Sequence, residues 1–210
     1  MPWLIAGLCA AVLVYWGPKS FELPRQSWLK SRWLMAVTAV YALIVMLSYG
    51  LNMIDPIHLP WLLSLTMLAL VDIKDKAVRV VDLGICSAFS LPLIHWGTVV
   101  PTVLVTLLVV MVLVALKFGL RQWYGQDAFG GADIWLIALI LLALGGAPAL
   151  VAIYVAIILS GLTGVVLMVT KAYTRRSYLP FIPFLALGVV VAIGFSDPLI
   201  ALYLRFVTGA

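Results

Sequence analysis

Two aspartates lie where an apolar segment meets a polar loop, a position in which a carboxylate can support chemistry. Asp72 ends the run "WLLSLTMLALVD", and Asp133 begins the run "DIWLIALILLALG". If the two carboxyl groups meet, like-charge repulsion and partial desolvation make them share one proton near neutral pH. The ionised group can then take a proton from water while the protonated group hydrogen-bonds a carbonyl, as in aspartic proteases. The alternative is that each aspartate only marks a helix end.

The composition places both aspartates in a membrane protein. Of the 210 residues, 65% are hydrophobic and 10% are charged, and the mean hydropathy is +1.20. A soluble domain of this size cannot hide that much apolar surface. We therefore predict an all-α polytopic membrane protein that forms one domain over residues 1–210, because helices pair their backbone groups internally in lipid. Cys9 and Cys86 lie in apolar runs without a CxxC partner, which gives no zinc site and no evidence of a disulfide.

The apolar runs predict about eight transmembrane helices. They cover residues 2–16, 33–50, 59–71, 80–96, 98–118, 133–145, 148–170 and 181–196. Twelve of the thirteen Lys and Arg residues fall in alternate loops, which the positive-inside rule makes cytoplasmic. Asp72 and Asp133 then share the cytoplasmic boundary, and the net charge of +5 reflects topology and not a nucleic-acid partner. A turn at Asp197 and a tail along the interface (198–207, with Arg205) are expected to follow the last span.

Three segments resemble the motifs of prepilin peptidases, which are GxGD-type aspartic membrane proteases. "LVDIKDKAV" resembles the segment of the family's first aspartate, and "FGGADIWLIA" resembles the motif of its second. "LPFIPFLALG" resembles the C-terminal signature, through Pro180, Phe181, Pro183, Phe184 and Gly188. The order and spacing of the three segments agree with the family.

The resemblance implies an aspartic endopeptidase of the bacterial inner membrane. Such enzymes cut the leader from type IV prepilins or pseudopilins at the cytoplasmic face, and Asp72 and Asp133 match the catalytic pair. Proteolysis implies no cofactor and no metal, whereas the N-methylation that many members add needs S-adenosylmethionine. Lipid and the prepilin are the implied partners.

The residues around the two aspartates suggest how a substrate would bind. Gly130, Gly131 and the small Ala132 would let an extended substrate backbone approach closely. The prolines of the third segment (Pro180 and Pro183) break the start of a helix and would line the entrance, while its two phenylalanines are expected to pack in the core. Small residues of the seventh span (Ser160, Gly161 and Gly164) are expected to allow close helix contact.

The chain also departs from the family pattern. Ala132 stands where the family often has glycine, and Trp135 stands where it often has lysine. No proline follows the first aspartate, which makes Asp75 a rival to Asp72. The segment 17–32 lacks the four-cysteine zinc domain of longer members, and the sequence holds no recognisable S-adenosylmethionine motif, which puts methylation in doubt.

Other readings remain open from the sequence. A small transporter or channel could use boundary aspartates to carry ions or protons, although neither an inverted repeat nor a midplane aspartate is present. A preflagellin-type peptidase would use the same chemistry on another substrate. Asp82 is expected in the first turn of a helix, and Asp127 in a solvated loop. His58 and His95 are expected to be polar residues of the outer interface and not metal ligands.

Overall fold

The computed structural model describes residues 55–75, 78–124, 130–169 and 179–208, and the elements in these ranges are all helical. The longer ones are α3 (Leu59–Asp75), α4 (Val80–Ser90), α5 (Val99–Tyr124), α6 (Gly131–Leu144), α7 (Gly146–Val169) and α8 (Ile182–Thr208). Short 3-10 helices flank them: η1 (Pro56–His58), η2 (Leu91–Leu93) and η3 (Trp96–Thr98). The all-α class is confirmed for these ranges.

Four of the described stretches are long and apolar enough to cross a bilayer. They are Pro56–Ile73, Trp96–Gln122, Gly146–Val169 and Ile182–Thr208. Val80–Leu93 and Gly131–Leu144 are apolar but shorter, below the roughly 20 residues that a perpendicular span needs. The predicted runs 2–16 and 33–50 lie outside the described residues. The prediction of about eight spans is therefore not confirmed. What the described ranges show is a helical fold with four helices long and apolar enough to cross a membrane.

The outer faces of α5 and α7 are apolar and exposed. On α5, Leu104, Leu108 and Met111 are more than half exposed, as are Leu162 and Val166 on α7. Large exposed apolar surfaces are rare on soluble monomers. These faces suit contact with lipid acyl chains, and together with the apolar helices they indicate a membrane protein.

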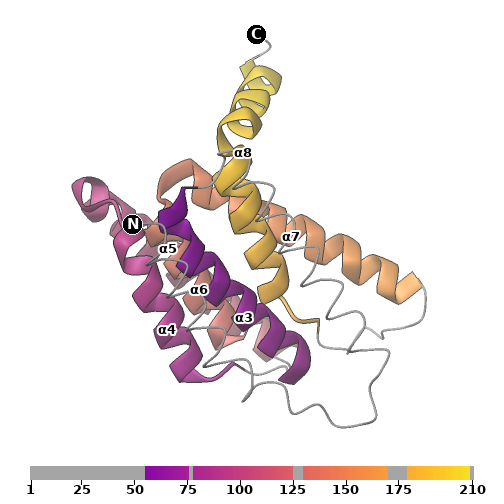
Figure 1. Ribbon diagram of the computed structural model, residues 1–210. Coiled ribbons are helices and arrows are strands. Elements are labelled where there is room, and N and C mark those ends of the chain that lie inside the picture. Colours follow the sequence, from indigo (N-terminus) through magenta and orange to yellow (C-terminus); the bar gives the residue numbers. More distant parts are fainter. Residues whose placement is uncertain (1–54, 76–77, 125–129, 170–178, 209–210) are drawn as a thin grey trace.

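Helix α8 continues well past the predicted end of the last span. It runs unbroken from Ile182 to Thr208 with Pro198 inside it, and Figure 1 shows its C-terminal half projecting beyond the other helices. The predicted turn at Asp197 and the separate tail 198–207 are therefore wrong. Proline removes one backbone donor, but helices in membranes accommodate this when the freed carbonyl finds another partner.

Helix α6 lies among the others and carries the centre of the core. It contacts α4, α5, α7 and α8 (Figure 1). Its Leu136 and Ile140 are fully buried, as are Leu65 on α3 and Leu185 on α8. A helix that is apolar all round is expected to be largely buried, and on α6 only Gly131 and Trp135 are exposed. This burial places the start of α6, and with it Asp133, inside the protein.

Helices α7 and α8 cross in close contact. A Cβ atom added to Gly188 would collide with the backbone carbonyl of Ala152, so only glycine allows this approach. Ala149, Ala152 and Ala156 are buried along the same part of α7. Ser160, Gly161 and Gly164 are not at this crossing. A Cβ on Gly161 would meet no described atom within 4 Å, whereas a Cβ on Gly164 would lie 3.8 Å from the side chain of Leu179, just before α8. This crossing fixes the position of the first half of α8. The first residue of α8, Ile182, contacts Asp72 of α3.

Candidate active site

Asp72 lies in the last turn of α3, with its carboxylate against the start of α8. Its side chain is 2% exposed, and its Oδ2 accepts the backbone N–H of Ile182, with 3.3 Å between oxygen and nitrogen. The backbone N–H of Phe181 also donates to this carboxylate. The first N–H groups of a helix lack intrahelical partners and carry partial positive charge. The N-terminus of α8 is therefore a favourable partner for a buried carboxylate.

Asp133 lies in the first turn of α6 and is 4% exposed. Its Oδ2 accepts the backbone N–H of Gly130, the N-cap residue, at 3.0 Å. The positive charge of Lys117 on α5 also acts on this carboxylate. Lys117 lies in α5, so its effect on Asp133 could be seen only after α5 and α6 were packed together.

The structure places these two aspartates close enough to interact electrostatically. They are far apart in the sequence, yet the negative charge of Asp133 acts on the carboxyl group of Asp72. Helix α8 contacts both α3 and α6, the helices that carry them. Two buried carboxyl groups in Coulombic range of each other can share a proton, so that one accepts a proton while the other donates a hydrogen bond.

The third sequence motif forms the start of α8 beside Asp72. Phe181 and Phe184 pack against the hydrophobic core, as expected, and Pro183 is buried within the first helical turn. Pro180, just before the helix, is half-buried. The sequence predictions missed the backbone N–H of Ile182 as the partner of Asp72. The prolines around it gave a usable signal, because proline near a helix start marks backbone donors without intrahelical partners.

The small residues before Asp133 occupy three different environments. Gly130 is half-buried and caps α6 with an extended backbone. Gly131 is exposed, and a Cβ added there would meet no described atom within 4 Å. Ala132 packs against the core. The space beside Gly131 matches the expected room for a substrate backbone, whose binding stays a prediction.

The other acidic side chains that the structure describes are either buried or exposed. Asp82 is buried in the first turn of α4, as expected, where its carboxylate pairs with Arg79 at 3.0 Å. Asp55 and Asp197 are exposed. The side chain of the rival Asp75 and the whole of Asp127 lie outside what the structure describes.

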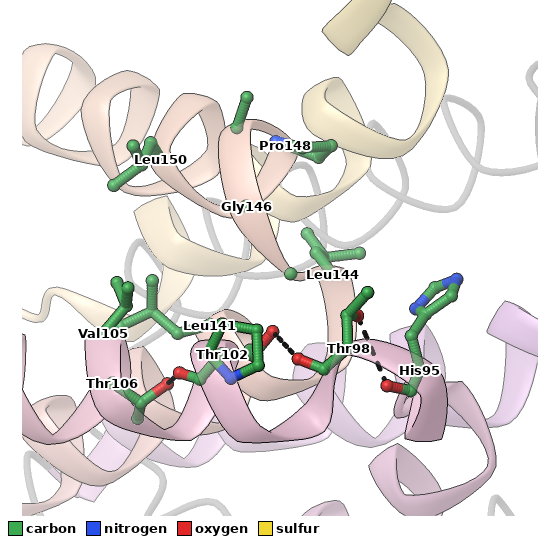
Figure 2. A pocket seen from close by; sticks show the side chains of 13 residues that line it. His95, Thr98, Thr102, Val105, Thr106, Leu141, Leu144, Gly146, Pro148 and Leu150 are labelled. Carbon is green, nitrogen blue, oxygen red and sulfur yellow. Dashed lines mark hydrogen bonds between the residues drawn. The ribbon is translucent and has the colours of Figure 1, made fainter.

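An open cavity lies at the other end of α5 and α6. Its volume is about 680 Å³, and its wall includes His95, the start of α5 and the α6–α7 turn (Figure 2). The hydroxyls of Thr98, Thr102 and Thr106 line it, each donating to a carbonyl three or four residues earlier. Leu144 in its wall is eleven residues after Asp133, about 16 Å along the helix. The cavity is therefore separate from the aspartate pair.

The histidines also lie away from the aspartate pair. His58 ends η1 at the start of α3, whereas Asp72 lies near the end of that helix. His95 precedes η3, and the two histidines are close enough to interact electrostatically. Within the described ranges, no group of three or more His, Cys, Asp or Glu side chains is placed to hold a metal ion.

The fold and the site define a helical membrane protein with a buried aspartate pair. One curated protein that the chain matches is the prepilin leader peptidase/N-methyltransferase of Bacillus subtilis (strain 168), at 31% identity over 80 residues. The match covers 38% of this chain and 32% of that protein, so it spans about a third of the relative's length. No family model matches the chain, and no solved structure matches it. The similarity supports the resemblance without covering enough of either protein to establish the family.

Proposed function

We propose that this chain is a membrane aspartic endopeptidase that removes the leader of type IV prepilins or pseudopilins at the cytoplasmic face of the bacterial inner membrane. The observation that carries the proposal is that Asp72 and Asp133, two buried carboxyl groups from separate helices, are close enough to interact electrostatically. The partial similarity to a prepilin leader peptidase supports the substrate class. The apolar outer faces of the helices support a bilayer as the setting.

The chemistry requires one ionised and one protonated aspartate. The ionised carboxylate takes a proton from water as the water oxygen bonds to the scissile carbonyl carbon. The protonated carboxyl group donates its hydrogen bond to the carbonyl oxygen, where negative charge develops. The C–N bond then breaks as the leaving nitrogen takes a proton from the pair. The leader ends in a new carboxylate, and the mature protein begins with a new amine.

The surroundings of the pair support such a reaction. The Ile182 N–H holds one oxygen of Asp72, and the Gly130 N–H holds one oxygen of Asp133. Each carboxyl group is therefore oriented by backbone, which cannot swing away as a long side chain can. The buried position also limits competing water, which strengthens electrostatic interactions at the site.

Co-expression with a prepilin tests the proposal. We expect Asp72→Asn and Asp133→Asn each to abolish leader removal, seen as a mass shift of the pilin, at unchanged protein level in the membrane. The matched control is Asp197→Asn, which removes an exposed carboxylate from α8 and is expected to process normally. Asp75→Asn separates the rival residue. Normal processing by either of the first two variants overturns the proposal.

The N-methyltransferase activity in the relative's name is a separate question for this chain. It would require S-adenosylmethionine as methyl donor. Mass spectrometry of the mature pilin N-terminus decides, because a methylated amine assigns this second activity to the chain and an unmodified amine removes it.

A further inference from the structure

Helix α6 carries Asp133 but has no polar face that would set its rotation about its own axis. Besides Asp133, its buried residues are all apolar: Ile134, Leu136, Ile137, Leu139, Ile140, Leu141 and Ala143. A helix that is apolar all round buries similar surface in many rotations. The hydrogen bond from Gly130 to Asp133 joins neighbouring residues and turns with the helix. A directional contact with another helix is therefore needed to point Asp133 at Asp72.

Trp135 makes such a contact. Its Nε1–H donates to Ser87 Oγ on α4 at 3.1 Å. The Ser87 hydroxyl donates in turn to the carbonyl of Leu83 at 2.7 Å, which leaves the oxygen lone pairs to accept from the indole. Trp135 follows Asp133 by two residues, and at 3.6 residues per turn the two side chains are roughly 200° apart. Holding Trp135 against α4 therefore directs Asp133 to the opposite side of α6.

Helix α4 connects this contact to the helix of the other aspartate. Cys86, next to Ser87, is fully buried in the same hydrophobic core as Trp61 and Leu65 of α3. Helix α4 contacts both α3 and α6. A rotation set at Ser87 is consequently a rotation relative to α3, which carries Asp72.

We propose that Trp135 and Ser87 form a positioning contact that sets the rotation of α6 and so keeps Asp133 facing Asp72. As a role in catalysis, this rests on the proposed peptidase function. The indole is 54% exposed, and a neutral hydrogen bond in such a setting has a modest net effect. Its loss is therefore expected to slow the reaction and not to abolish it.

The kinetic test uses the full chain in liposomes with a prepilin substrate. Trp135→Phe and Ser87→Ala should each lower kcat about fivefold, the loss that one net hydrogen bond corresponds to, with KM unchanged. The double variant should be no slower than either single variant. Ser87→Thr, which keeps the hydroxyl group, should have the wild-type kcat. Trp96→Phe and Ser160→Ala are matched controls with unchanged kcat. Additive losses, or wild-type kcat in both single variants, overturn the proposal.

A second measurement does not depend on any substrate. The side chain at position 133 is 4% exposed, so Asp133→Cys should react slowly with N-ethylmaleimide. The labelling of the chain without this substitution is measured in parallel and subtracted. Adding Ser87→Ala should raise the labelling rate about fivefold, as α6 samples other rotations; adding Ser160→Ala should not. Unchanged labelling overturns the positioning role even if prepilins are cleaved. Raised labelling in a chain that cleaves no prepilin supports the contact and overturns only the peptidase function.

Discussion

The first turns of α4 and α6 hold a buried aspartate at the same place with different partners. Asp82 and Asp133 are each the third residue of their helix, and they are 2% and 4% exposed. The N-cap residues also match in backbone shape, with φ −75° and ψ 143° at Arg79 and φ −67° and ψ 151° at Gly130. The difference is that Arg79 gives its aspartate a guanidinium, whereas Gly130 gives only a backbone N–H.

This difference separates a structural carboxylate from a candidate catalytic one. A guanidinium that bonds both carboxylate oxygens stabilises the ionised form and occupies both oxygens. At Asp133 a single backbone N–H is bonded to one carboxylate oxygen, and among the described residues the only positive side chain found to act on it, Lys117, does so through its charge. Burial and helix position are the same in both turns, so neither property alone identifies the site. The choice of residue at the N-cap does more to distinguish the two.

The largest expected effect is the difference in cleavage rate between variants of Asp133 and variants of Asp82. Asp133→Asn is expected to lower the rate of prepilin cleavage by roughly 100-fold or more, since it removes an acid–base group. Asp82→Asn should stay close to the wild-type rate, because the exposed Arg79 side chain can be solvated without its partner. Cleavage rates at matched protein levels check both. A comparable loss in the two variants would show that first-turn aspartates act only through helix stability.

The two turns can also be made alike. Gly130 has a backbone conformation that arginine adopts, so Gly130→Arg should pair with Asp133 as Arg79 pairs with Asp82. We expect the cleavage rate to fall roughly tenfold or more, as one acid–base group becomes locked in an ion pair. The thermal unfolding temperature should not fall. Gly130→Gln, of similar length but uncharged, is the control and should lose much less activity.

Breaking the ion pair between Arg79 and Asp82 should lower the stability of the protein and leave the cleavage rate unchanged. Arg79→Gln leaves the carboxylate of Asp82 buried without its ion-pair partner, which is costly. Because the Arg79 side chain is 61% exposed and screened by water, we expect a loss of about 1 kcal/mol in the free energy of unfolding. Denaturant unfolding in micelles measures this loss. A drop in kcat per folded molecule would count against the structural role.

The smallest effect concerns the first residue of each helix. Gly131→Ala places a methyl group in open space, so stability should be unchanged or slightly higher. If a substrate backbone passes here, KM should rise about threefold, a loss comparable to one weakened contact, with kcat unchanged. Val80→Ala, at the equivalent exposed position of α4, should leave KM unchanged. Equal KM values for wild type and Gly131→Ala would place the substrate elsewhere.

Much of the fold could be predicted from the sequence because membrane helices are visible in it as long apolar runs. The runs 59–71, 98–118, 133–145, 148–170 and 181–196 correspond to α3, α5, α6, α7 and α8. Helix boundaries were harder to predict. The run 80–96 contains Pro92, and α4 ends at Ser90, whereas α8 passes through Pro198. Proline alone therefore does not decide where a helix ends.

The position of Asp72 and Asp133 at apolar boundaries was readable from the sequence, and so was their possible pairing. Their actual proximity depends on how α3, α6 and α8 pack, which no local pattern encodes. The partners of the site were harder still. The Ile182 N–H belongs to the backbone, so its only sequence signal is the neighbouring Pro180 and Pro183, which mark a helix start. The contact between Trp135 and Ser87 requires the relative rotation of two helices. The close approach of Gly188 to Ala152 depends on where α7 and α8 cross.

Cleavage by the purified protein tests the central claim most directly, because no other peptidase is then present. The full chain in liposomes is incubated with a purified prepilin, and mass spectrometry follows the products. We expect the wild type and Asp82→Asn to release one leader peptide, and Asp72→Asn and Asp133→Asn, folded to the same extent, to release none. Leader release at the wild-type rate by either of the last two variants would contradict the aspartate pair as the catalytic centre.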